Sequence, residues 1–324
     1  EGFGNVAVGR SSMVANTTGD NNVAVGQNSL VSNTTANNNT AIGTCAMIAT
    51  TTGANNTAVG FSALDTNTTG CENVAVGRDT MFAGTTACRS VAVGYRALKS
   101  VTTAANNVGV GYHALCTNTT GTDNTAVGVS ALENNTTANG NSAFGRCALL
   151  DNTTGAANNT FGTESLANNT TGGCNNAFGN AALGQNTTGA RNVAMGHLAL
   201  YANTTGTDNT AVGHCALSAN TTGIYNNAVG CSALLSNTEG TDNNAFGNKA
   251  LCANTTGDNN VAVGRLSLRN NTTANENVGI GKEALCATQT GSNNVAVGAC
   301  SLKVNTASNN TAVGWKSLFS STSG

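Results

Sequence analysis

The chain has 324 residues, of which only 9 % are charged, and its formal net charge is −2. This balance provides no basic stripe for nucleic acid and no acidic tail, and no apolar run approaches the roughly 20 residues of a membrane-spanning helix. We therefore expect neither nucleic-acid binding nor a membrane span. No secretion signal is visible, and the start at Glu1 suggests a processed product or a part of a longer chain.

A short, fixed period organises the sequence. A glycine closes a short apolar phrase at Gly9, Gly26 and Gly43, and the 17-residue step continues to Gly298; only the last step, to Gly314, is one residue shorter. A fixed period of this order is typical of solenoids. The 19 phrases predict an all-β fold, a parallel β-solenoid or β-roll of 19 coils, that forms one uninterrupted domain over residues 1–324.

Each coil contains the same predicted elements in the same order. A Val-Ala-Val phrase, as at residues 23–25, favours a β-strand. A tight turn at the closing glycine should follow, and then a short strand around the Leu or Met four residues later. An Asn-Thr-Thr-Gly or Asn-Thr-Thr-Ala turn, as at residues 33–36, ends the coil. Strands of successive coils are expected to pair in parallel, about 4.8 Å apart.

Because the same residues recur with the period, identical side chains should lie above one another. An asparagine stands four residues before the closing glycine in every coil except at Ser90, which predicts a ladder of hydrogen-bonded amides. The Leu or Met column predicts a continuous apolar row. These two columns include Asn22, Asn39 and Asn56, and Leu30, Leu64 and Leu98.

The predicted strand is apolar on both faces. Val6, Val8 and Val25 point to one side, and Ala7 and Ala24 point to the other. One side fills the coil, and the other needs a covering partner, as in strands that are buried on both faces. We therefore expect lateral self-association around an axis parallel to the stack.

The phrases resemble the head repeats of trimeric autotransporter adhesins and repeats in phage tail-fibre shafts. The resemblance rests on NVAVG at Asn22–Gly26, NTAIG at Asn39–Gly43 and NTAVG at Asn56–Gly60, and it covers essentially the whole chain. It implies a left-handed parallel β-roll, three chains side by side, and a surface-binding role outside the cell.

The two ends of the sequence have almost the same phase. Residues 321–324 imitate the Asn-Thr-Thr-Gly turn, and residues 1–4 precede Asn5. An uncovered end coil exposes unpaired backbone groups, which invites the addition of another coil. We expect head-to-tail polymerisation or a segment of a longer fibre; a fragment cut from a larger fibre is the alternative.

Eleven cysteines cannot all pair within one chain. Cys71 and Cys88 stand one full period apart, in one column of adjacent coils, and this spacing suits a disulfide. Cys215 and Cys231 are one position short of a full period apart and form a second candidate pair. Such disulfides indicate an oxidising, extracellular setting.

Histidines and cysteines also meet in one surface column. His197, His214 and Cys231 are on consecutive coils, with Cys215 beside them, an arrangement that could bind zinc. Coincidence in a variable column accounts for it more simply, and we expect no metal and no cofactor.

The turn sequence Asn-Thr-Thr is also an acceptor sequence for N-glycosylation. A row of glycans along one edge is one interpretation, and a structural preference for Asn and Thr in the turn is the other. The candidate acceptors are Asn16, Asn33, Asn67, Asn118, Asn135, Asn152, Asn169, Asn186, Asn203, Asn220, Asn254 and Asn271.

No catalytic constellation stands out, so we do not expect an enzyme. The favoured function is a structural subunit of an extracellular fibre, located outside the cell or on a virion or cell surface. An adhesin or tail-fibre shaft that binds glycans or a cell surface is the alternative. A third, weaker hypothesis is ice binding by threonine rows such as Thr17, Thr34, Thr51 and Thr68.

Overall fold

The computed structural model describes residues 2–321 and contains no helix within them. The fold is an all-β parallel β-solenoid of about 18 turns with a 17-residue spacing. The 19 closing glycines bound 18 intervals, which reconciles the 19 predicted coils with this number of turns. Residues 1–159 and residues 160–324 form two compact units, and the prediction of one uninterrupted domain stays a prediction.

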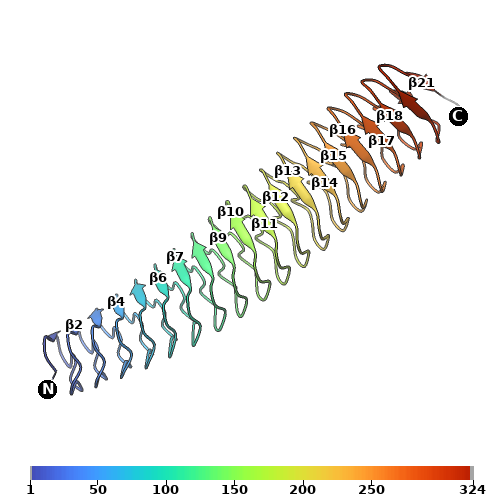
Figure 1. Ribbon diagram of the computed structural model, residues 1–324. Helices are drawn as coiled ribbons and strands as arrows, with labels where there is room; N and C mark the ends of the chain where they lie inside the picture. The colour runs from blue at the N-terminus through green and yellow to red at the C-terminus, as the bar shows by residue number, and fades with distance from the viewer. Residues whose placement is uncertain (1, 322–324) are drawn as a thin grey trace. The chain divides into compact units, whose positions relative to one another are not determined.

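The first unit contains nine short strands, one for each coil, that lie side by side on one face of the coils (Figure 1). Each pairs in parallel with the strand one period further along the chain, so that Val6 lies opposite Val23 and Ala7 opposite Ala24. The strands are β1 (Val6–Val8), β2 (Val23–Val25), β3 (Thr40–Ile42), β4 (Thr57–Val59), β5 (Val74–Val76), β6 (Val91–Val93), β7 (Val108–Val110), β8 (Thr125–Val127) and β9 (Ser142–Phe144).

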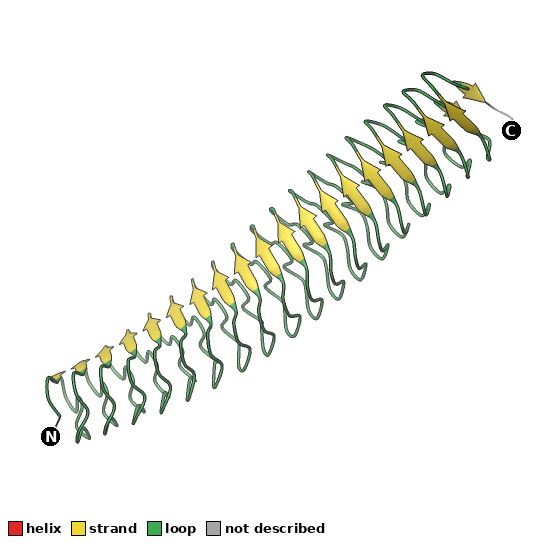
Figure 2. Cartoon of the chain, in the orientation of Figure 1, coloured by secondary structure: helices red, strands yellow, loops and turns green. Residues whose placement is uncertain are grey.

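Strand β10 (Asn159–Phe161) spans the boundary between the units. The second unit repeats the same pairing from β11 onward, and Figure 2 shows its strands joined by turns. Its strands are β11 (Asn176–Phe178), β12 (Val193–Met195), β13 (Thr210–Val212), β14 (Asn227–Val229), β15 (Asn244–Phe246), β16 (Val261–Val263), β17 (Val278–Ile280), β18 (Val295–Val297), β19 (Val304–Asn305), β20 (Thr311–Val313) and β21 (Ser320–Ser321).

The prediction of a second strand around the Leu or Met column is wrong for most coils, because the backbone turns there. Asn28 and Leu30 have φ angles of 56° and 49°, in the left-handed region. The turn is nevertheless tied to both neighbouring coils: Asn28 N donates to Arg10 O at 3.0 Å, and Leu30 N donates to Ala46 O at 3.0 Å. Within residues 2–321 only β19 and β21 form a short second strand, and they pair with each other.

A narrow core runs through the inside of the coils. In the first unit Leu30, Leu64 and Leu98 are fully buried, and so is the middle residue of most strands, such as Ala24. Since successive strand pairings keep the same offset, these side chains form the predicted row. The core of each coil therefore consists of one large aliphatic side chain, small alanines and asparagine amides.

The closing glycine is required by two geometric conditions. Gly26 has a φ of 138°, which side chains with a Cβ rarely adopt. A Cβ at Gly26 would also overlap the carbonyl oxygen of Gly43 in the next coil. The glycine column therefore sets how closely adjacent coils approach at this edge.

The single short coil shows where the repeat tolerates a deletion. Strand β18 pairs with β20 at an offset that is one position shorter than elsewhere, with Val295 opposite Thr311. The missing residue belongs to the Asn-Thr-Thr turn, where Asn294 Nδ2 now donates to Ala307 O at 3.0 Å. Strand pairing resumes in register beyond this turn, so the turn absorbs the change.

Candidate functional site

The predicted amide ladder is confirmed in the first unit. Asn22, Asn39 and Asn56 are fully buried. Each side-chain oxygen accepts a hydrogen bond from the backbone N–H of the next asparagine, at 2.9 Å from Asn39 to Asn22 and 2.9 Å from Asn56 to Asn39. Each Nδ2 donates across the coil to a carbonyl of the following turn, as Asn22 does to Ala36 O at 2.8 Å. We call this column the first amide ladder.

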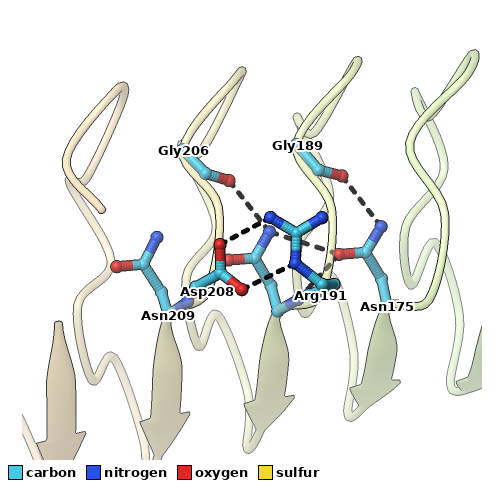
Figure 3. A network of polar contacts seen from close by, with 7 residues as sticks. Asn175, Gly189, Arg191, Gly206, Asp208 and Asn209 are labelled. Carbon is cyan, nitrogen blue, oxygen red and sulfur yellow. Dashed lines mark hydrogen bonds and ion pairs between the residues drawn. The ribbon is translucent and has the colours of Figure 1, made fainter. Parts of the chain in front are cut away.

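The first amide ladder continues in the second unit, where Figure 3 shows it with an ion pair beside it. Asn175 Nδ2 donates to Gly189 O at 2.9 Å, and Asn175 Oδ1 accepts from the backbone of Asn192 at 3.0 Å. On the surface next to it, Arg191 makes two hydrogen bonds of 2.7 Å to Asp208. These bonds lower the pKa of the Asp208 carboxyl below its usual value. Because the pair is exposed, it contributes little to stability.

The asparagines of the Asn-Thr-Thr turns form a second amide ladder, which the sequence analysis did not predict. Asn135 Nδ2 donates to Asn118 Oδ1 at 2.9 Å and to Ala138 O at 3.2 Å. In the second unit Asn203 repeats the pattern, with bonds of 2.8 Å to Asn186 Oδ1 and 3.0 Å to Gly206 O. In the first unit the carbonyl of Ala138 accepts from both ladders, because Asn124 Nδ2 of the first amide ladder also donates to Ala138 O at 2.8 Å.

The buried position of these turn asparagines contradicts the expectation of a glycan row. A glycan is attached to Nδ2, and that nitrogen lies inside the coil. Asn16 is half-buried, and the other eleven candidate acceptors are fully buried: Asn33, Asn67, Asn118, Asn135, Asn152, Asn169, Asn186, Asn203, Asn220, Asn254 and Asn271. A sugar on any of the buried nitrogens is incompatible with this packing, so the recurrence of the sequence follows from the ladder.

The threonines of the turn are only partly available to solvent. Thr17, Thr34, Thr51 and Thr68 each donate their hydroxyl to the carbonyl of the threonine in the next coil, at 2.9 to 3.2 Å. The threonines that follow them along the chain, such as Thr69, are exposed. The turn edge thus presents one exposed hydroxyl row, and ice binding stays an untested expectation.

All eleven cysteines are free thiols. The Sγ atoms of Cys71 and Cys88 are 2.9 Å apart, so their predicted disulfide requires oxidation and only a small movement. The hydrogen bond between them, together with burial, raises the pKa of the Cys71 thiol to about 11. Cys215 and Cys231 interact electrostatically, and their pairing also stays a prediction.

A cluster of two histidines and one cysteine lies on the edge that follows the closing glycines. The ligand atoms of His197, His214 and Cys215 all lie within 4.8 Å of one another. The histidine rings are stacked with centroids 5.3 Å apart, and Cys215 Sγ is 3.8 Å from His214 Nε2. Cys231, which the sequence pattern placed in the same column as the histidines, is not part of this group.

The same edge carries exposed aromatic side chains in the first unit. The rings of Tyr95, Tyr112 and His113 are stacked, with centroids of Tyr112 and His113 4.1 Å apart. His113 Nδ1 lies 2.9 Å from Glu133 Oε1, which fixes the histidine ring. Arg78 lies over the ring of Phe61 at 5.6 Å.

The outward face of the strands is a long uncharged surface. It consists of the first and third residue of each three-residue strand, and we call it the outer strand face. No residue at these positions is charged, and the third residue is always Val, Ile, Met or Phe. Ile42 in the first unit and Phe246 in the second are 40 % and 44 % exposed.

No family model and no curated protein sequence matches this chain. The described residues include no helix with the length and hydropathy needed to cross a bilayer.

Proposed function

We propose that this protein is a structural subunit of an extracellular fibre, and that it associates with further copies of itself through the outer strand face. The observation that carries this proposal is the outer strand face itself. It repeats in every coil, it is uncharged, and it leaves large apolar side chains partly in water. A surface of this kind on successive coils is typical of an interaction site.

The free energy gained by covering exposed apolar side chains favours association over many coils. Covering the exposed half of one Val or Phe contributes about 1 kcal/mol. A single coil is therefore far below the roughly 4–15 kcal/mol that association costs, whereas the summed contribution of about eight coils is comparable with it. The design suits long contacts between parallel copies rather than a local binding site.

The interior supports a mechanical role. The buried amides of both ladders bond from coil to coil, as between Asn39 and Asn22, and the backbone does the same at every strand. The resemblance to adhesin heads and tail-fibre shafts adds a three-chain arrangement outside the cell as the form of the assembly that we favour.

The test replaces two outward valines of the first unit by lysine. Val76→Lys with Val110→Lys adds charge to the outer strand face without touching the core. The matched control, Thr69→Lys with Thr103→Lys, adds the same charge to the exposed threonine row. Sedimentation velocity and electron microscopy should show assemblies for the wild type and the control, and single chains for the valine variant. Monomeric wild-type protein, or equal behaviour of both variants, would contradict the proposal.

A second candidate function, adhesion to a surface glycan, is favoured by the stacked rings on the glycine edge. Tyr112 is 49 % exposed and rests on Tyr95 and His113, a platform of the kind on which sugar rings stack. A glycan array with the intact protein tests it. Binding that is lost in Tyr112→Ala but kept in Phe61→Ala would support adhesion at this platform, and the absence of any bound glycan would argue against it.

A further inference from the structure

We propose that His197, His214 and Cys215 form a binding site for a borderline-soft divalent metal ion, zinc above all. Two imidazole nitrogens and one sulfur are the donor set that zinc prefers over calcium or magnesium, which require oxygen ligands. The three ligand atoms come from two adjacent coils of the second unit and lie within 4.8 Å of one another. The proposal does not depend on the function of the fibre.

The backbone holds the three residues in fixed positions. His197 and His214 each follow a closing glycine, one coil apart, so parallel stacking brings their side chains to the same place on successive coils. Cys215 N donates to His197 O at 3.0 Å, which ties the cysteine directly to the first histidine. Cys215 has a φ of 53°, a left-handed turn conformation that directs its side chain to the edge where the histidines lie.

The distances leave only a small adjustment for a metal ion. Tetrahedral zinc with bonds of about 2.0–2.1 Å to nitrogen and about 2.3 Å to sulfur places its ligand atoms roughly 3.3–3.6 Å apart. Cys215 Sγ and His214 Nε2 are already 3.8 Å apart. Both histidines are exposed, so their rings can tilt from the stacked arrangement and close the remaining gap. A water molecule would complete the fourth position.

The residue types argue against a chance grouping. The chain contains only three histidines, and two of them lie in this cluster. The third, His113, has a carboxylate partner 2.9 Å away in Glu133, whereas among residues 2–321 no carboxylate belongs to the His197 group. Binding at the cluster would form a metal–sulfur bond and release the proton of the Cys215 thiol to solvent.

Cobalt(II) is the probe, because a cobalt–thiolate bond gives a charge-transfer absorption that histidine ligands alone do not give. The full chain is reduced, freed of metal and titrated with Co²⁺, and Zn²⁺ is then added to displace the cobalt. We expect one equivalent of Co²⁺ to bind and to show the thiolate charge-transfer absorption, and we expect Zn²⁺ to abolish that absorption. Circular dichroism of each metal-free variant verifies that the fold is kept.

Three variants locate the site. Cys215→Ser should remove the charge-transfer band, and His197→Gln should weaken cobalt binding at least about tenfold, the lower bound for loss of an outer-shell partner. The matched control is Cys174→Ser, which removes an exposed thiol outside the cluster and should change nothing. The proposal is overturned if the wild type shows no thiolate band, if the band persists in Cys215→Ser, or if Cys174→Ser removes it equally.

Discussion

The smallest cohesive unit of this protein is the buried side-chain amide. An asparagine offers two N–H donors and one acceptor, and in both ladders these groups are bonded within the same coil and to the neighbouring coils, as for Asn135. A buried amide without partners costs about 1–3 kcal/mol. In the second ladder, from Asn33 to Asn271, each buried amide oxygen therefore has a partner only where the next coil also provides an asparagine.

The interruptions of the second ladder show this cost. Where the next coil lacks the asparagine, the preceding side-chain oxygen is buried without a hydrogen-bond partner, as at Asn33, Asn67 and Asn271. Thr50 replaces the amide after Asn33, and its hydroxyl only accepts a bond of 3.3 Å from Asn67. Threonine is too short to reach back to Asn33.

Repairing the ladder should stabilise the protein. We predict that Thr50→Asn raises the free energy of unfolding by about 1–2 kcal/mol, because the new amide donates to the orphaned Asn33 oxygen. Asn135→Ala should lower the free energy of unfolding by about 2–4 kcal/mol, since partners in two adjacent coils lose their bonds. Chemical denaturation measures both changes. Thr52→Asn, at an exposed position, is the control, and a gain as large as that of Thr50→Asn would refute the ladder mechanism.

At this scale the sequence predicted one ladder and missed the other. The first ladder was readable because Asn22 and Asn39 stand beside an apolar strand, a place where a polar side chain needs a partner. The second was hidden because Asn33 and Asn135 occur in a turn sequence that equally suits an exposed glycan acceptor. Only the direction of the backbone, which points these side chains inward, separates the two interpretations.

The cluster of His197, His214 and Cys215 shows the same limit. The period of the sequence correctly placed His197 and His214 on adjacent coils. It did not show that Cys215 rather than Cys231 joins them, because that depends on the left-handed backbone at Cys215. Periodicity gives the position of a Cα atom along the stack, whereas the direction of a side chain follows from φ and ψ.

The coil is the next structural unit, and most of it is turn. In most coils only three residues form a regular strand, while positions such as Leu30 adopt a left-handed conformation that costs a non-glycine residue roughly 1–2 kcal/mol. Burial of the leucine side chain offsets this cost. A coil therefore depends on its neighbours, whose backbone groups bond to this turn.

Removal of a complete coil should be tolerated. Deleting residues 112–128 joins Gly111 to Val129 and keeps every column in phase. We predict that this variant keeps its circular dichroism spectrum and unfolds within a few degrees of the wild type. Deleting only residues 112–119 moves all later side chains out of register and should abolish cooperative unfolding. Equal thermal stability of the two deletions would show that vertical registry is not what holds the coils together.

At the scale of the whole molecule, cohesion depends on hydrogen bonds and burial rather than on charge. Ion pairs such as Arg191 with Asp208 are exposed. Because the pKa of Asp208 is lowered in the folded protein, its carboxylate stabilises the fold at a pH above the pKa of the unfolded state. This stabilisation is lost as the pH falls through the pKa of the folded state, but solvent screens the contribution. The free energy of unfolding should therefore depend little on salt concentration. It should also depend little on pH until the pH falls to the range in which carboxyl groups titrate.

Alkaline solution should lower the stability through the thiol groups. The Cys71 pKa rises from 9.0 to about 11 in the folded protein, so the protonated thiol is favoured by folding. Its contribution is complete below the unfolded pKa and is lost as the pH rises through the folded pKa. We predict a constant thermal midpoint from about pH 5 to pH 8 in reducing buffer, and a decline above about pH 9. The decline should be smaller in Cys71→Ser, and an identical decline would assign it to other groups.

The parallel bonding of coils within a unit has a mechanical consequence. Each coil is held to its neighbour by bonds directed along the stack, as between Val23 N and Asn39 O. A force that pulls the two ends of a unit apart therefore peels off one coil at a time instead of loading all coils together. Each detached turn would release about 60 Å of slack, the length of one repeat at full extension. Under tension the protein would behave as an extensible tether that lengthens in even increments and dissipates work at each one.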